Sequence, residues 1–234
     1  MRKIQLVLVA LIVLILSAFK ADHVITIYMI GDSTMSNKPL EGNNQERGWG
    51  HVLGSFFTED VRVENHAMNG RSSKSFIDEG RWETVVNKIR PGDYVFIQFG
   101  HNDEKPQPER HTDPGTTFDE NLRKFVRETR AKGGIPVLFN SIVRRNFGVN
   151  PDAVAADDIR PEKDEAVVEG DTLIDTHGKY LESPRNVAKE MDVCFIDLNQ
   201  ATKKLVESYG VEGSKKLFMW IPADTYAACP KGRQ

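Results

Sequence analysis

Three short runs of the sequence hold the residue types that ester hydrolysis through a covalent intermediate requires. Ser33 lies in the run IGDST, Gly70 in the run NGRSS and Asn102 in the run FGHND. A serine hydroxyl becomes a nucleophile once a base accepts its proton. Backbone N–H groups and an asparagine amide can stabilise the oxyanion that forms when the hydroxyl attacks a carbonyl carbon. The three runs therefore indicate acyl-transfer chemistry, provided that the fold brings them together.

Each of these residues, taken alone, also has a structural interpretation. The residues around Ser33 make a good helix N-cap, and Asn69-Gly70 is first of all a turn signal. A single loop asparagine such as Asn102 commonly caps a turn. Only the position of the three runs relative to the predicted strands favours a catalytic role.

The elements that must position these residues alternate between strand-like and helical patterns. Apolar runs typical of buried strands span Val24–Ile30, Val61–Glu64, Tyr94–Phe99, Pro136–Ile142 and Val193–Leu198. Between them, a capping-box pattern at Thr117 and Glu120 opens a helix that Gly133 ends, and apolar stripes at 82–89 and 187–191 indicate two more. This alternation predicts an α/β fold with a central parallel sheet and helices on both faces.

The three chemically interesting runs follow the first three predicted strands. In open parallel sheets, ligands bind at the carboxyl ends of the strands. We therefore expect Ser33, Gly70 and Asn102 to meet at one edge of the sheet.

In order and placement, the three runs resemble the conserved blocks of the SGNH (GDSL-type) hydrolases. The residues in and around them are similar to the rhamnogalacturonan acetylesterase branch of that family. They include RGWG at 47–50, NGRSS at 69–73, FGHND at 99–103 and DTHGKY at 175–180. The resemblance implies a three-layer αβα sandwich of the flavodoxin-like SGNH type. It also implies an esterase that removes acetyl groups from pectic rhamnogalacturonan, with no metal or organic cofactor.

The same resemblance implies roles for single residues. Ser33 would be the nucleophile, and the oxyanion hole would consist of the backbone N–H groups of Ser33 and Gly70 and the side-chain amide of Asn102. In this family the base is the histidine of an Asp-x-x-His motif near the C-terminus. No Asp-x-x-His occurs in the 234 residues, and no histidine follows His177. We therefore expect the catalytic Asp and His to be absent from this chain, with His101 and His177 as weak substitutes.

This absence leaves several functions open. The chain is either an incomplete record of an active enzyme or a product with little activity, and loss of the last helix would expose apolar surface. The alternatives to a pectin acetylesterase are an esterase on another acetylated glycan or on a lipid, and a catalytically silent carbohydrate-binding protein.

The N-terminus predicts export. Arg2 and Lys3 precede an apolar run from Ile4 to Phe19, which is typical of a signal peptide over residues 1–21, with the hydrolase domain over 22–234. An uncleaved anchor is the alternative, and it would be the only contact with a membrane. In a periplasmic or extracellular setting Cys194 and Cys229 could pair, although a buried free thiol at Cys194 is the competing prediction.

Composition narrows the partners. The chain has 31 basic and 34 acidic side chains, a net charge of −3 and a hydrophobic share of 39%. Nucleic-acid binding would require a clustered basic surface, so we expect an acetylated polysaccharide and no nucleic acid as partner. The acidic stretch at 152–171 lacks the glycine and closing glutamate of an EF-hand and is predicted to be a solvated loop.

Overall fold

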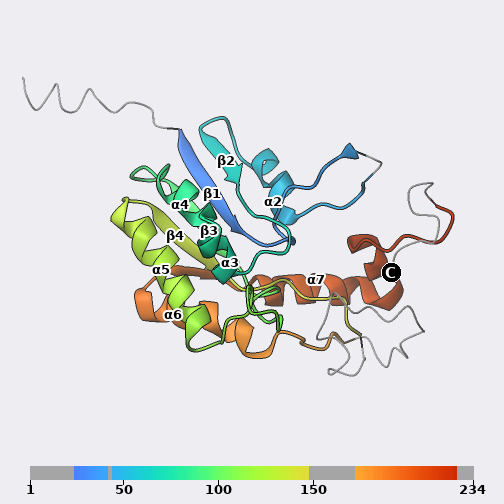
Figure 1. Cartoon of the computed structure of the whole chain (residues 1–234). Helices are drawn as coiled ribbons and strands as arrows, with labels where there is room; N and C mark the ends of the chain where they lie inside the picture. Colours follow the sequence, from blue (N-terminus) through green and yellow to red (C-terminus); the bar gives the residue numbers. More distant parts are fainter. Residues whose placement is uncertain (1–23, 42–43, 148–171, 226–234) are drawn as a thin grey trace, which may run out of the picture.

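The computed structural model describes residues 24–41, 44–147 and 172–225 and contains a central sheet of five parallel strands (Figure 1). The strands are β1 (Ile25–Gly31), β2 (Val61–Asn65), β3 (Tyr94–Gln98), β4 (Ile135–Phe139) and β5 (Cys194–Ile196). Their order is β2-β1-β3-β4-β5, which is the flavodoxin-like order. The predicted α/β fold with a parallel sheet is confirmed. The order reverses between β1 and β3, and this switch point is where such sheets bind ligands.

One face of the sheet is covered by four helices. They are α3 (Ser73–Asp78), α4 (Arg81–Val86), α5 (Thr117–Ala131) and α6 (Glu182–Met191). Apolar side chains from all four pack on Ile30, Val95 and Ile97 of the strands. Because successive strand residues point to opposite faces, Val95 and Ile97 are fully buried here while Tyr94 and Phe96 face the other side.

Phe125 of α5 lies at the centre of this core. Its ring is fully buried, stacked on Phe99 at 5.5 Å between centroids and edge-on to Trp82 at 5.0 Å. We expect Phe125→Ala to lower the free energy of unfolding by about 3–5 kcal/mol, because it removes buried area and leaves a cavity. Urea denaturation measures this loss. The exposed Arg127→Ala on the same helix is the control, and a loss equal to that of this control would contradict the packing described.

The opposite face is covered only in part. The short helix α2 (Trp49–Val52) and the turn η2 (Leu53–Phe56) pack over β1 and β2. Near β4 and β5, Ile135 is 40% exposed and Ile196 is 42% exposed. Part of this face is therefore open to solvent. Cys194 is exposed on it as well, so the prediction of a buried thiol is wrong: its side chain points to the uncovered face.

The last long helix, α7 (Leu198–Gly213), extends beyond the sheet (Figure 1). It is kinked at Gly210 and packs through Val206 on the segment after β4, where Val143 and Phe147 are buried. The helix begins directly after β5, because the Asp197 side chain accepts a hydrogen bond from Gln200 N and so caps the helix. This cap ends β5 at Ile196, two residues before the predicted end of the strand.

The N-terminal cap of α5 differs from the prediction. α5 begins at Thr117, but the expected capping box is wrong. The Thr117 hydroxyl accepts from Asp113 N at 2.7 Å, and Glu120 binds Arg127 at 2.7 Å instead of turning back to the N-cap. A reciprocal capping box occurs instead on α3, between Ser72 and Ser75.

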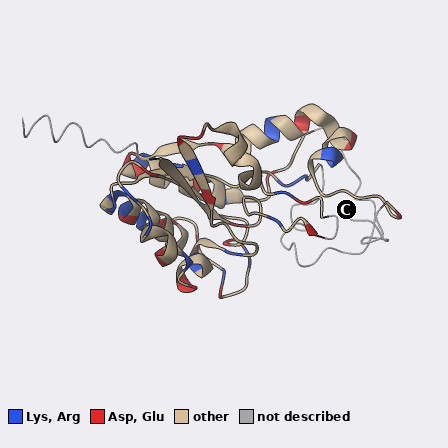
Figure 2. Ribbon diagram, turned by 90° about the horizontal axis from the view of Figure 1, so that it is seen from above, with Lys and Arg blue, Asp and Glu red and all other residues tan. Residues whose placement is uncertain are grey.

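Several predictions lie outside the described residues: the signal peptide at 1–21, the acidic loop at 152–171 and Cys229. Among the described residues no helix is long and apolar enough to cross a membrane. Lys and Arg intermingle with Asp and Glu along the described ribbon (Figure 2).

Candidate active site

Ser33 lies on the turn that leaves β1, and buried hydrogen bonds fix this turn. The carboxylate of Asp32 is fully buried and accepts from the backbone N–H and the hydroxyl of Thr34, both at 2.8 Å. The Thr34 hydroxyl in turn accepts from Gln98 Nε2 at 2.7 Å, and Gln98 Oε1 accepts from Trp49 Nε1 at 2.6 Å. These bonds tie the turn to the end of β3 and to α2, so that Ser33 is held on rigid elements.

The loop that carries Gly70 is bound to the same turn. The side-chain oxygen of Asn69 accepts from Ser36 Oγ and from Lys38 Nζ, each at 2.6 Å. Lys38 is 4% exposed and also pairs with Glu46 at 3.0 Å. A buried ammonium group needs such partners to offset its loss of hydration. The contacts place the Gly70 loop beside the Ser33 turn.

Asn102 joins the site from the loop after β3. It is 3% exposed, and its Nδ2 donates to the carbonyl oxygen of Arg71 at 3.1 Å. Its neighbour Asp103 is fully buried and accepts from Ser73 Oγ at 2.5 Å and from Thr112 Oγ1 at 2.9 Å. Hydrogen bonds therefore connect the turn of Ser33, the loop of Gly70 and the loop of Asn102 into one assembly at the switch point.

Two buried carboxyl groups lie under this assembly. Burial raises the pKa of Asp32 to about 6, although hydrogen bonds from Thr34 lower it. Burial likewise raises the pKa of Asp103 to about 7, against hydrogen bonds from Ser73 and Thr112, and the nearby Asp32 charge raises it further. Both groups hold protons in the folded state at pH values where an unfolded chain has released them.

The raised pKa values predict that these carboxyl groups favour the folded state less as pH rises. Between the ordinary pKa of 3.8 and about 7, the folded protein binds more protons than the unfolded chain at Asp103. Its contribution to the free energy of unfolding therefore falls by about 1.4 kcal/mol for each pH unit in that window. Urea denaturation of wild type and Asp103→Asn from pH 5 to pH 7 measures the difference in slope. Equal slopes would contradict the raised pKa.

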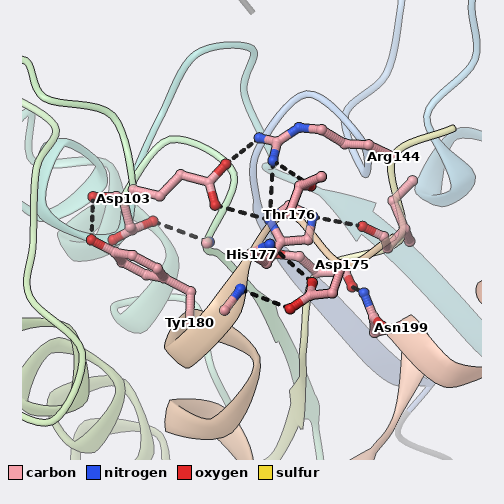
Figure 3. Close-up of polar contacts among 12 residues, drawn as sticks. Asp103, Arg144, Asp175, Thr176, His177, Tyr180 and Asn199 are labelled. Carbon is pink, nitrogen blue, oxygen red and sulfur yellow. Dashed lines mark hydrogen bonds and ion pairs between the residues drawn. The ribbon is translucent and has the colours of Figure 1, made fainter. Parts of the chain in front are cut away.

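A second polar cluster lies around His177 (Figure 3). Glu104 forms an ion pair with Arg144 and contacts His177 Nδ1 at 2.9 Å. His177 Nε2 contacts the carbonyl oxygen of Ile142 at 3.0 Å. Asp175 caps the turn by accepting from His177 N at 2.9 Å. Both ring nitrogens of His177 are thus engaged, and the ring is not free to accept a proton from Ser33.

His101 packs edge-on against His177, with ring centroids 4.5 Å apart. It is 7% exposed, and burial together with the charge of His177 holds its pKa well below the ordinary value. His101 Nε2 has no hydrogen-bond partner among the described residues. No hydrogen bond connects it to Ser33, so neither of the two substitute histidines is placed as a base.

The other described histidines are occupied elsewhere. His51 Nδ1 accepts from Lys38 N at 3.2 Å, His66 lies 3.4 Å from Glu64, and His111 contacts Lys105 O and Asp113. The Ser33 hydroxyl itself makes no hydrogen bond within the described segments. In the same segments, no group of three or more His, Cys, Asp or Glu side chains is placed to hold a metal ion.

An open hollow of about 370 Å³ adjoins the site on the side of Gly70. It lies between the Gly70 loop, helix α3 and the loop after β3. Its lining is mostly charged: Gly70, Arg71, Ser75, Asp78, Glu79, Glu109 and Arg110. Hydroxyl-rich ligands suit such a surface, because carboxylates accept and guanidinium groups donate hydrogen bonds.

A serine on the turn that leaves the first strand, flanked by a glycine loop and a buried asparagine on a five-stranded parallel sheet, is the arrangement of a GDSL-type hydrolase. The sequence matches the model of the GDSL-like lipase/acylhydrolase family over residues 29–210, and the chain belongs to this family. It is accordingly a hydrolase that acts on ester bonds.

Within this family, the chain is similar to proteins named as rhamnogalacturonan acetylesterases. The chain is 39% identical to the rhamnogalacturonan acetylesterase RhgT of Bacillus subtilis, over 89% of this chain and 79% of RhgT. It is 31% identical to the probable rhamnogalacturonan acetylesterase YesY of the same organism, over 86% of this chain and 80% of YesY. Among solved structures, protein YxiM of Bacillus subtilis matches with a TM-score of 0.66 and 28% identity. That match covers 83% of this chain and 49% of YxiM.

Sequence reasoning missed the residues that support the site. Lys38, Arg71 and Gln98 each contact a loop of the site, yet none was singled out as a candidate. Arg71 stood inside the NGRSS run, so the motif itself was the available signal. Lys38 and Gln98 have no such signal, because their burial depends on segments distant in the sequence.

Proposed function

We propose that this chain is an exported serine esterase that removes acetyl groups from pectic rhamnogalacturonan through an acetyl-enzyme. The observation that carries the proposal is the hydrogen-bonded assembly of the Ser33 turn with the loops of Gly70 and Asn102. The similarity to RhgT over most of both chains supports the substrate, and the basic and apolar N-terminus supports export.

In the proposed reaction, Ser33 Oγ attacks the acetyl carbonyl carbon and a base accepts the hydroxyl proton. The negative charge then moves to the carbonyl oxygen. The N–H groups of Ser33 and Gly70 and the amide of Asn102 donate to this oxyanion, and loss of one such donor commonly costs about 10²–10³ in rate. The tetrahedral intermediate collapses, the sugar oxygen leaves with a proton, and water then hydrolyses the acetyl-enzyme to acetate.

The saccharide would occupy the hollow beside Gly70. An acetyl group bound at Ser33 with its carbonyl oxygen at Gly70 N–H leaves the sugar close to Arg71 and Arg110. The hollow is open to solvent, so a long polysaccharide chain can extend beyond it on both sides. Its volume falls in the range of about 300–1,000 Å³ that is common for ligand sites.

The proposed reaction needs a group that accepts the Ser33 hydroxyl proton. No described histidine is hydrogen-bonded to Ser33, and this favours a silent carbohydrate-binding protein as the second candidate function. The two functions differ in one observable: a silent protein binds the polysaccharide without releasing acetate.

The test measures acetate released from acetylated rhamnogalacturonan, with acetylated xylan and a lipid ester as comparison substrates. It uses the 234-residue chain and a second form that continues past Gln234 through the downstream reading frame. We expect release from the longer form to be highest on rhamnogalacturonan. Saccharide binding without release by both forms would support the silent protein, and preference for xylan or lipid would overturn the substrate.

A further inference from the structure

The turn that carries Gly70 has a definite type. Arg71 N donates to Met68 O at 3.3 Å, so residues 68–71 form a β-turn. Gly70 has a φ of +75°, and Asn69 is not among the residues of positive φ. A positive φ at the third position alone defines a type II turn, whereas a type I turn requires a φ near −90° there. A Cβ on Gly70 would have nothing within 4 Å, so the backbone angle and not space accounts for the glycine.

The two turn types differ in the direction of their central peptide. Here this peptide joins Asn69 to Gly70. Because a trans peptide is planar, the carbonyl oxygen of Asn69 and the N–H of Gly70 point in opposite directions. Rotating the plane from type II to type I would therefore turn the Gly70 N–H away from any oxyanion that it now faces.

Arg71 holds the carbonyl end of that peptide. Its Nη1 donates to the carbonyl oxygen of Asn69 at 3.0 Å. Its Nε donates to both carboxylate oxygens of Glu79 at 3.0 and 3.1 Å, so the guanidinium is anchored to the end of α3. The backbone carbonyl of Arg71 meanwhile accepts from Asn102 Nδ2. One residue thus contacts the peptide of Gly70 and the side chain of Asn102.

We propose that Arg71 is a positioning residue that keeps the Asn69–Gly70 peptide in the type II orientation and so directs the Gly70 N–H at the substrate oxyanion. This role rests on the proposed function, because it presupposes that Gly70 N–H is an oxyanion donor. The cationic donor on the Asn69 carbonyl also polarises the peptide, which strengthens its N–H as a donor. Glu79 takes part by fixing the guanidinium against the loop.

The first arm of the test reads the peptide orientation without any need for turnover. In a type II turn the Gly70 amide proton lies close to the Asn69 Hα, so the wild-type 234-residue chain should show a strong NOE between them. We expect this NOE to weaken markedly in Arg71→Gln. It should persist in Arg81→Gln, a matched control, because Arg81 Nε binds the same Glu79 at 2.5 Å but is not hydrogen-bonded to the Gly70 loop. An unchanged NOE in Arg71→Gln would overturn the proposal.

The second arm measures acetate release by whichever form releases acetate, the 234-residue chain or the longer form. We expect Arg71→Gln to lower kcat about 10- to 100-fold, somewhat less than the cost of deleting an oxyanion donor. Arg71→Lys should recover part of this loss, because an ammonium can still donate to Asn69 O. Glu79→Gln, at an exposed position, should give a smaller loss and guards against misfolding of the arginine variant.

The arms separate two kinds of failure. If no form releases acetate, the proposed function fails, while the NOE still decides whether Arg71 holds the peptide. If acetate is released and kcat is unchanged in Arg71→Gln, the positioning role is overturned whatever the NOE shows.

Discussion

Ser33→Ala is expected to abolish acetate release by the form of this protein that releases it. Removal of the nucleophile from serine hydrolases lowers kcat by about 10⁴–10⁶, and the remaining rate comes from substrate binding and the oxyanion donors. The Ser33 side chain makes no hydrogen bond within the described residues, so its loss leaves the buried bonds of Asp32, Thr34 and Gln98 in place. We therefore expect binding of the polysaccharide and the free energy of unfolding to stay close to the wild-type values.

The measurement is acetate release compared with binding of acetylated rhamnogalacturonan by the same preparations. Ser208→Ala is a matched control, since Ser208 is an exposed residue of α7 whose hydroxyl binds only within its own helix. Activity that persists in Ser33→Ala within tenfold of the wild type would rule out Ser33 as the nucleophile.

Asn102→Ala is expected to cost about 10²–10³ in kcat with little change in KM. The amide donates to the oxygen that becomes charged in the transition state, so its loss raises the barrier more than it weakens substrate binding. Its partly buried bond to the Arg71 carbonyl is lost as well, which lowers the free energy of unfolding by about 1 kcal/mol.

Asn102→Asp separates the two effects. It keeps the shape of the side chain but replaces the donating amide by a carboxylate, which would repel the oxyanion, so activity should fall at least as far as in the alanine variant. Asn87→Ala, at the exposed end of α4, serves as the control. Steady-state kinetics decide the matter: a rise in KM with kcat unchanged in Asn102→Ala would show a ground-state binding role instead.

The parts of this structure that follow from local patterns were predictable from the sequence. The runs that become β1 and β3 are short and apolar, the run that becomes β2 alternates valine with polar residues, and a polar cluster follows each of the three. The rule that ligands meet at the carboxyl ends of parallel strands then placed Ser33, Gly70 and Asn102 together. Such a prediction needs only the order of the elements along the chain.

Contacts between distant segments were not predictable in the same way. Lys38 and Asn69 are 31 residues apart, and Trp49 and Gln98 are 49 apart, so no local pattern announces that they bind. Ambiguous local signals also failed. The spacing of Thr117 and Glu120 fits a capping box, but their side chains bind Asp113 and Arg127 instead.

The role of the DTHGKY run also emerged only from the structure. As a sequence it offered a candidate base in His177. In the fold that ring is 3% exposed and supports the loop of His101 and Asn102 from behind, through Glu104 and Arg144. His177 binds Glu104 and the Ile142 carbonyl rather than Ser33, so in this fold it is a supporting residue.

The central claim, that Ser33 is the group acylated by the substrate, is tested most directly by trapping the acetyl-enzyme. The form of the chain that releases acetate is incubated with an activated acetyl ester, quenched in acid, and examined by intact mass and peptide mapping. We expect one acetyl group on the peptide that contains Ser33, absent from Ser33→Ala and reduced in Asn102→Ala. Acetylation confined to other residues, or equal labelling of wild type and Ser33→Ala, would contradict the assignment of Ser33 as the nucleophile.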